Sequence, residues 1–420
     1  MAGWTKWSGF MKFAISLALI AASTSLLAAQ GSMRERVLRD AALAAGIAEP
    51  EALNVPVPDA LVAVGADLFQ STLLSFNGDT SCSSCHLDQF GSADGLRVAI
   101  GVGGSGEGAE RAQSGGDIVP RNTLPLWGRG GLGFETFFWD GKVAVTEEGI
   151  FSQFGPDAPS QDPLVVAAHL PVVQIREMLA HDELIETEYE TETVDSAAVI
   201  AVRVADRIRD DPSLGPALGG AQSVELTDLA FIDIAEALAA FIRSNFRMQP
   251  SRFSNFVLRG GELSNEEVRG GLLFYGKGRC SACHAGPYLT DFDFHTIALP
   301  QAGFGINGFG VDYGRYNTTL DTEDLYRFRT PPLWQVTQTA PYGHSGSIDD
   351  LGDMIRYHFD PLFEWTPEGF STDERVEFTR RLLLWGREEV QIPAMSDDEI
   401  DALVTFLNTL SFAPASAPDP

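Results

Sequence analysis

The sequence predicts a mainly α-helical protein with long loops and two halves of similar layout. Apolar residues recur at helical spacing in several segments, among them 58–75 and Asp228 to Arg243 in the first half. In the second half, Ser264 and Ser396 each stand three residues before a glutamate and open an apolar helical pattern, which is the capping-box arrangement. The 42 glycines among 420 residues indicate substantial loops between the helices.

The remaining segments complete this layout. They are, in chain order, a partly helical leader at 30–55, a glycine-rich loop from residue 87 to about residue 121, helices at 166–181 and 195–210, an acidic, Thr-rich and exposed stretch at 182–194, and a connection from Met248 to Gly261. The glycine-rich loop is not a phosphate loop, because no Gly-Lys-Ser/Thr follows it. The pattern assigns no role to residues 182–225.

The two ends of the chain are expected to lie outside the fold. Residues 1–29 resemble a secretory signal, because two lysines precede an apolar run and Ala28-Ala29 offers small residues for cleavage. The pattern predicts export to the periplasm with cleavage near Ala29, although a retained membrane anchor would look similar. The tail at 413–420 is rich in Pro, Ala and Ser and is expected to be disordered.

A formal net charge of −29 restricts the class of partner. Nucleic acids are excluded, because phosphate binding needs clustered Lys and Arg. The acidic residues either keep the surface soluble or attract a basic protein partner, and both interpretations fit the charge.

All four cysteines fall in two identical frames, Cys82-Ser-Ser-Cys85-His86 and Cys280-Ser-Ala-Cys283-His284. The Cys-x-x-Cys-His sequence attaches c-type haem. Its two thiols reach the two vinyl groups on one edge of a porphyrin, and the next imidazole can then bind the iron. Disulfides, zinc or a redox dithiol are alternatives, but none of them explains the histidine after each pair. The sequence therefore predicts two covalently bound haem c groups.

Each frame stands between an amphipathic helix and a closing helix, which is the order of elements in helical cytochrome c domains. We therefore expect two cytochrome c-like domains with one haem each, the first at 30–250 and the second at 251–412.

Beyond these frames, roughly residues 58–411 resemble the bacterial di-haem cytochrome c peroxidase superfamily, which includes the MauG-type di-haem oxidases. The motifs that carry the resemblance are, in order, LFQSTLLSFNGDTSCSSCH, Arg121-Asn122, FWDGK from Phe138, Glu177-Met178, GLLFYGKGRCSACHAGPYLTDFDFH and FRTPPLWQVTQTAPYGHSG. The resemblance implies a peroxidatic haem on His86 and an electron-transfer haem on His284.

The resemblance also implies roles for single residues. Trp139 matches the tryptophan that lies between the haems and relays electrons, whereas a tryptophan without this motif would be assigned to core packing. Glu177 matches the distal glutamate that moves a proton between the two oxygens of peroxide, and a solvated glutamate is the alternative.

A calcium ion between the domains is implied as well. Its ligands would be the side-chain oxygen of Asn122 and the backbone carbonyls of Thr339 and Pro341, since oxygen donors suit this hard cation. The alternative is that Asn122 and Thr339 only satisfy hydrogen bonds in turns. The family further suggests a homodimer.

The sequence departs from the family pattern at the first haem. Ordinary peroxidases cap this haem with a histidine from the loop before the Arg-Asn motif, but no histidine stands between His86 and His169. We therefore expect a permanently open first haem. The family's distal glutamine also has no clear match near Gly149 and is left unassigned.

A second departure concerns the sixth ligand of the second haem. The family places methionine, or tyrosine in MauG-type oxidases, 14 residues after the histidine that is His344 here. That position holds His358, which predicts bis-histidine ligation with His284, and Met354 is the alternative one helical turn away.

Three functions compete. The leading expectation is a peroxidase that reduces hydrogen peroxide to water with electrons from a small cytochrome or copper protein. The second is a MauG-like oxidase that uses peroxide-derived high-valent haem to oxidise a Trp or Tyr of a protein partner, and both departures favour it. The third is a pure electron-transfer or sensor cytochrome, against which Glu177 argues.

Overall fold

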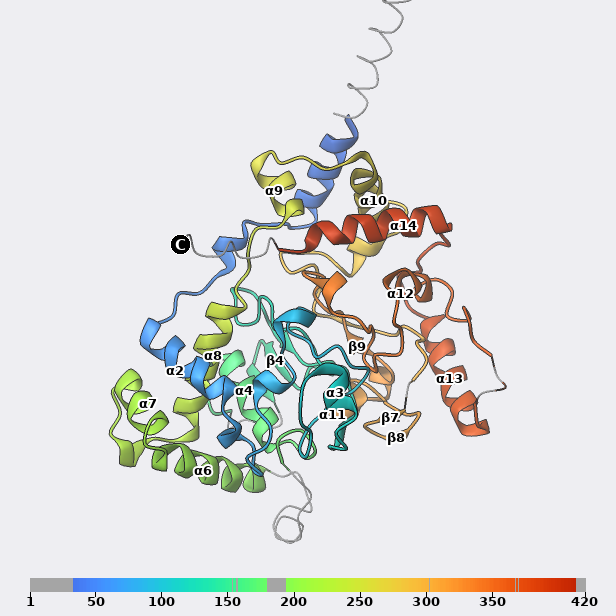
Figure 1. Cartoon of the computed structure of the whole chain (residues 1–420). Helices are drawn as coiled ribbons and strands as arrows, with labels where there is room; N and C mark the ends of the chain where they lie inside the picture. The colour runs from blue at the N-terminus through green and yellow to red at the C-terminus, as the bar shows by residue number, and fades with distance from the viewer. Residues whose placement is uncertain are drawn as a thin grey trace, which may run out of the picture.

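The computed structural model describes residues 33–412 except 153, 156–157, 180–193, 302, 367 and 369. Most of its regular structure is helical (Figure 1). After a helical segment at 33–44, the helices are α2 (Asp59–Gln70), α3 (Gly108–Ala112), α4 (Pro163–Val173), α6 (Val194–Asp210), α7 (Leu214–Gln222), α8 (Phe231–Asn245), α9 (Arg252–Arg259), α10 (Asn265–Tyr275), α11 (Tyr316–Thr319), α12 (Leu351–Tyr357), α13 (Thr372–Trp385) and α14 (Asp397–Leu407).

The strands are short and antiparallel. They are β1 (Ala99–Ile100), β2 (Ile118–Val119), β3 (Thr136–Phe137), β4 (Val143–Thr146), β5 (Gly149–Ser152), β6 (Phe294–His295), β7 (Phe304–Gly305), β8 (Gly308–Phe309) and β9 (Phe328–Arg329). The pairings among these strands are β1–β2, β3–β4–β5, β6–β9 and β7–β8. These small sheets fix loops rather than build a layer, which agrees with the helical class that the sequence predicts.

A close helix pair organises the first half. Helix α2 lies against α8, and a Cβ atom added at Gly65 would stand 2.0 Å from the carbonyl oxygen of Ala237. Only glycine permits this approach, which brings the two helices together in front of the first cysteine frame. The buried apolar faces of α2 and α8 belong to the main hydrophobic core.

The second half repeats this arrangement with α10 and α14. A Cβ atom at Gly270 would stand 1.9 Å from the carbonyl oxygen of Ala402. Both predicted capping boxes are present, because the N–H groups of Ser264 and Ser396 donate to the glutamate three residues on, at 2.7 and 3.0 Å. In each half, therefore, the helix before the cysteine frame packs through a glycine onto a later helix.

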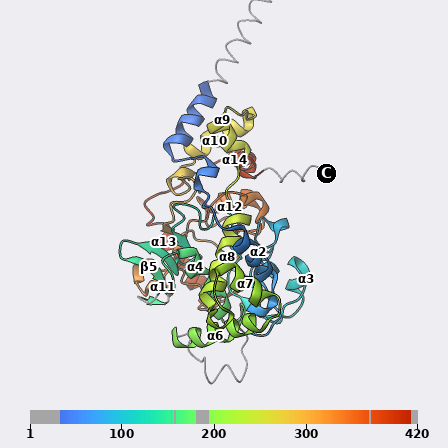
Figure 2. The ribbon, with the colours of Figure 1, turned by 90° about the vertical axis from the view of Figure 1, so that its left-hand side faces the viewer.

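The residues around 33–46 pack against the second half of the chain. The guanidinium of Arg39 donates to the carbonyls of Phe256 and Gly261, and the N–H of Gly286 donates to Ala45. Figures 1 and 2 both show this first helix beside α9 and α10.

Two predicted elements differ from the structure. The predicted helix at 166–181 is α4, which begins at Pro163 and already ends at Val173. Residues 174–179 form a turn instead, in which the carbonyl of Gln174 accepts hydrogen bonds from three N–H groups, including that of Glu177. The predicted connection from Met248 to Gly261 contains helix α9, which is capped by Ser251. The predicted signal at 1–29, most of the stretch at 182–194 and the tail at 413–420 lie outside the described residues.

The described residues include no helix with the length and apolarity needed to cross a bilayer. The small sheets matter more for the site: the turn between β3 and β4 carries Trp139, and the N–H of Arg329 in β9 donates to the carbonyl of Trp139 at 2.8 Å.

Candidate active site

The first cysteine frame opens into a large cavity of about 830 Å³. Cys82, Cys85 and His86 line one side of it, while Trp139 and Glu177 line it from other segments of the chain. Three of the residues that the sequence singled out in separate motifs, His86, Trp139 and Glu177, therefore meet at one cavity.

His86 is oriented as an iron ligand. Its Nδ1–H donates to the carbonyl of Ser92 at 2.8 Å. This bond fixes the orientation of the ring and leaves Nε2 as the nitrogen that can bind iron. Burial lowers the pKa of His86 to about 4, so the imidazole is neutral, as a ligand must be. Burial also raises the pKa of Cys82 and Cys85 to about 12, an environment that suits uncharged thioether sulfur. These residues and the cavity fit a covalently attached haem.

Glu177 is the acid-base candidate in the same cavity. Burial raises the pKa of its carboxyl above the usual range, and the ammonium of Lys142 partly offsets this rise. The turn at 174–179 holds Glu177 in place, because its N–H donates to the carbonyl of Gln174 at 3.2 Å. A carboxyl group whose pKa is moved toward neutrality is suited to accept and return a proton.

Lys142 and Gln174 are cavity residues to which the sequence assigned no role. The Nζ of Lys142 donates to Oε1 of Gln174 at 2.9 Å and lies 4.6 Å from the ring centre of Phe138. Lys142 stands in the FWDGK motif, which was the available signal. The family's glutamine was sought near Gly149. Gln174 stands 25 residues after Gly149 and three residues before Glu177, so the order of the motifs did not indicate it.

Trp139 is a wall residue of the cavity and is buried at 9 % exposure. Its Nε1–H donates to the carbonyl of Asn122 at 2.9 Å, and its own carbonyl accepts from Arg329. The indole is therefore held rigidly by residues of both halves of the chain.

The second frame brings two histidines together. The Nδ1–H of His284 donates to Leu289 at 3.1 Å, and the Nδ1–H of His358 donates to Met354 at 2.8 Å, so both rings keep Nε2 for another partner. Burial, together with the nearby His358, lowers the pKa of His284 to about 4. Two neutral imidazoles close to one cysteine pair fit a haem with two histidine ligands.

Met354 and Tyr357 lie differently. Both belong to a small apolar cluster around Leu299, Tyr342 and Ile348. Tyr357 is 5 % exposed and packs edge-on against Phe363. Met354 therefore packs in an apolar cluster, whereas His358 lies near enough to His284 to affect its pKa.

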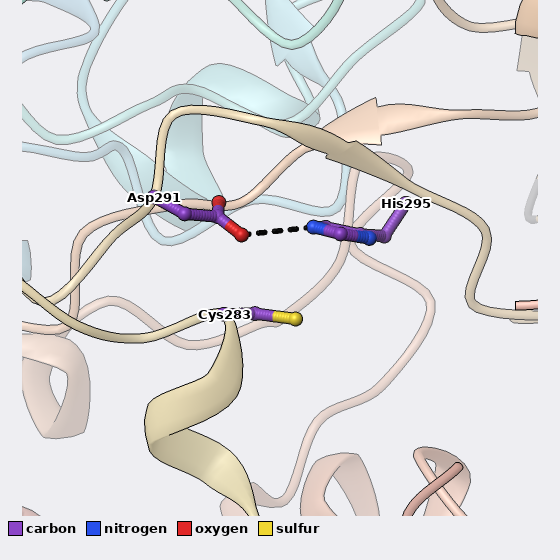
Figure 3. Close-up of side chains that lie close together, drawn as sticks. All are labelled: Cys283, Asp291 and His295. Atoms are coloured by element: carbon purple, nitrogen blue, oxygen red, sulfur yellow. Dashed lines mark hydrogen bonds and ion pairs between the residues drawn. The ribbon is translucent and has the colours of Figure 1, made fainter. Parts of the chain in front are cut away.

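A second group of metal-ligand types lies beside the second frame. Atoms of Cys283, Asp291 and His295 lie within 4.8 Å of one another (Figure 3). Nε2 of His295 bonds Asp291 at 2.9 Å, and Nδ1 is 3.5 Å from Glu388. Cys283 is the second cysteine of the Cys-x-x-Cys-His frame, and a haem bound there would take its sulfur as a thioether, so this group is not assigned to a separate metal.

The implied calcium residues converge only in part. The carboxamide nitrogen of Asn122 donates to the carbonyls of Leu96 at 2.8 Å and Pro341 at 3.3 Å. Thr339 is buried, and its hydroxyl donates to Val336. Asn122 and Pro341 are therefore neighbours, as the resemblance implies.

The helical fold, the two Cys-x-x-Cys-His frames and the acid-base cavity together define a haem-dependent oxidoreductase of the c-type cytochrome class. The model of the family described as di-haem cytochrome c peroxidase matches residues 59–262. The chain is similar to this family, whose description names two haems, and it carries two Cys-x-x-Cys-His frames.

The proteins that the chain is similar to include both MauG and cytochrome c peroxidases. The chain is similar to methylamine utilization protein MauG of Paracoccus denitrificans, with 29 % identity over 88 % of this chain and 92 % of the relative. It is similar to cytochrome c551 peroxidase of Pseudomonas aeruginosa, with 26 % identity over 71 % and 72 %. Its fold resembles the diheme peroxidase BthA of Burkholderia thailandensis, with a TM-score of 0.61, 22 % identity, and coverage of 88 % of this chain and 90 % of that one.

Proposed function

We propose that the protein reduces hydrogen peroxide to water at the first haem, using electrons that enter through the second. The observation that carries this proposal is the position of Glu177, on the wall of the cavity into which the His86 frame opens. The bound haem would account for the cavity itself, but a pure electron-transfer cytochrome does not need a buried carboxyl group on its wall.

The proton movements can be assigned to this chain's residues. Bound haem supplies the two electrons that convert H₂O₂ and two protons into two molecules of water. The carboxylate of Glu177 accepts the proton of one peroxide oxygen and returns it to the other, which becomes the leaving water. Lys142 keeps a share of Glu177 ionised, and Gln174 holds Lys142 in reach.

Electron supply is proposed to run through Trp139. The carbonyl of Asn122 that accepts its Nε1–H is not a base, so the indole keeps its proton while charge passes. Trp139→Phe should slow turnover with a reduced donor far more than it slows the first reaction with peroxide. Equal slowing of both steps would remove Trp139 from the electron path.

The finer assignments are part of the same proposal. We propose one cytochrome c-like domain for each frame, at 30–250 and 251–412, with the segment around 33–46 packed against the second domain. We also propose His358 as the sixth ligand of the second haem. A calcium ion would be held by Asn122, Pro341 and Thr339. Metal analysis of the holoprotein before and after chelation tests this site, and one calcium per chain lost with a change in activity is the expected result.

Location and partners follow from the same reasoning. Haem attachment outside the cytoplasm and the N-terminal pattern support an exported, periplasmic enzyme. The net charge of −29 supports a basic electron donor, such as a small cytochrome or copper protein. The homodimer that the family suggests can be checked by light scattering.

A second candidate function is oxidation of a protein partner. Histidine in place of methionine at position 358 favours it, because bis-histidine ligation lowers the reduction potential relative to His/Met and weakens the match with a high-potential donor.

One experiment separates the two functions. The oxidised protein is mixed with peroxide without a donor, and then reduced cytochrome c is added. Rapid donor oxidation, two electrons for each peroxide, supports the peroxidase. A near-infrared absorbance that persists for minutes and is indifferent to the donor supports the oxidase.

A further inference from the structure

Two buried arginines in the region between the cysteine frames lack acidic partners. Arg129 is 7 % exposed and Arg329 is 1 % exposed, and neither forms an ion pair with any residue that the structure describes. Nη2 of Arg329 has no hydrogen-bond partner within the described part of the chain. An unpaired buried charge is strongly unfavourable, and the residues that the structure describes supply no counter-charge.

The arginines also repel each other. Burial, together with the nearby charge of Arg129, lowers the pKa of Arg329 to about 9. Asp140 and Asp291 lie near enough to offset part of this effect, but Asp140 is paired with Arg121 and Asp291 with His295. The two guanidinium groups thus share one electropositive region.

This region extends from one frame to the other. Arg129 lines the same cavity as His86 of the first frame. Arg329 interacts with Asp291, whose N–H donates to the carbonyl of Cys283 at 2.8 Å. Among the described residues, these guanidinium groups donate hydrogen bonds to carbonyls alone: Arg129 Nε to Pro125, Arg329 Nε to Phe138 and Arg329 Nη1 to Thr330.

We propose that Arg129 and Arg329 form a carboxylate-binding site between the two frames, occupied by propionate groups of the bound haems. Guanidinium groups bind carboxylates through paired N–H donors, and a haem brings two such groups. The site neutralises propionates at the edge near Trp139, because Arg329 also binds the carbonyls of Phe138 and Trp139. The inference rests on bound haem but not on peroxidase activity.

The test uses holoprotein and the variants Arg329→Gln and Arg129→Gln. Haem content is measured first, then the propionate bending band in the resonance Raman spectrum and the midpoint potentials of both haems. We expect the band to shift and at least one potential to fall, because a cation that stabilises the reduced state is lost. Arg329→Lys should keep the potential closer to that of the wild type.

Arg381→Gln is the matched control. Arg381 is also buried, at 4 % exposure, but Glu377 and Asp312 lie near it and it does not line the haem cavity. It should leave the propionate band and both potentials unchanged. If Arg329→Gln yields no holoprotein, Arg129→Gln decides alone.

Two results would overturn the proposal. One is an unchanged band and unchanged potentials in haem-loaded glutamine variants. The other concerns added acetate: the wild-type midpoint potential responds to it saturably, the glutamine variants lose this response, and the propionate band stays constant in all of them. The site would then hold a free carboxylate from solution.

Discussion

Replacing Glu177 with glutamine removes the proton carrier and keeps the size of the side chain. The turn at 174–179 depends on backbone bonds, so the variant should fold and bind both haems. General acid-base catalysis contributes about 10²- to 10⁴-fold, which corresponds to about 3–5 kcal/mol of the barrier. We expect a loss of this size in the second-order rate of the oxidised protein with peroxide, followed by stopped-flow absorbance.

Two further variants sharpen this prediction. Glu177→Asp withdraws the carboxyl group by one methylene, and a misplacement of ~1 Å can cost about 10²-fold. Glu148→Gln, at an exposed carboxyl group in the hairpin between β4 and β5, is the matched control and should react at the wild-type rate. A Glu177→Gln rate within about threefold of the wild type, far below the 10²-fold minimum, would refute the assignment.

Three other changes test separate parts of the structure. Because the ionised carboxylate accepts the proton, the rate of reaction with peroxide should fall as pH falls through the pKa of Glu177. Lys142→Gln removes the cation that lowers this pKa, so the acid limb of the pH–rate profile should move to higher pH. An unmoved limb would contradict the proposed effect of Lys142 on Glu177. His358→Met should raise the potential of the second haem in spectroelectrochemical titration, whereas no change would place another ligand there. Gly270→Ala should destabilise the protein by about 1–3 kcal/mol in denaturant unfolding, since its Cβ meets a carbonyl at 1.9 Å, while Gly220→Ala in α7, with nothing within 4 Å, should be neutral or stabilising.

The parts of the fold that the sequence predicted are those governed by local pattern. Periodicity indicated α2, α8, α10 and α14, and the Ser-Glu boxes marked two helix starts. Helix α9 escaped this reasoning because its box pairs Ser251 with Ser254 rather than with Glu or Gln. The end of α4 also escaped, because Ile175, Met178 and Leu179 continue its apolar pattern through a turn.

The residues of the site also divide into those that sequence motifs predicted and those that the motifs missed. The cysteine frames, Glu177 and Trp139 stand in motifs and were predicted, although only the structure shows the cavity that joins them. The contact between Lys142 and Gln174 spans 32 positions, and no spacing rule indicates it. Arg129 and Arg329 are 200 positions apart, and their shared lack of acidic partners is visible only once the chain is folded.

The spin state of the first haem is the most direct test of an open distal side. No histidine lies in the loop between His86 and His169. His169 itself is packed between Phe154 and Phe231 with Nδ1 bonded to Val165, so neither that loop nor His169 offers a histidine as a distal cap. The decisive measurement is the electron paramagnetic resonance spectrum of the oxidised protein after haem quantitation. Two haems per chain, one high-spin and one low-spin, are the predicted result. Two low-spin signals, or fewer than two haems, would contradict it.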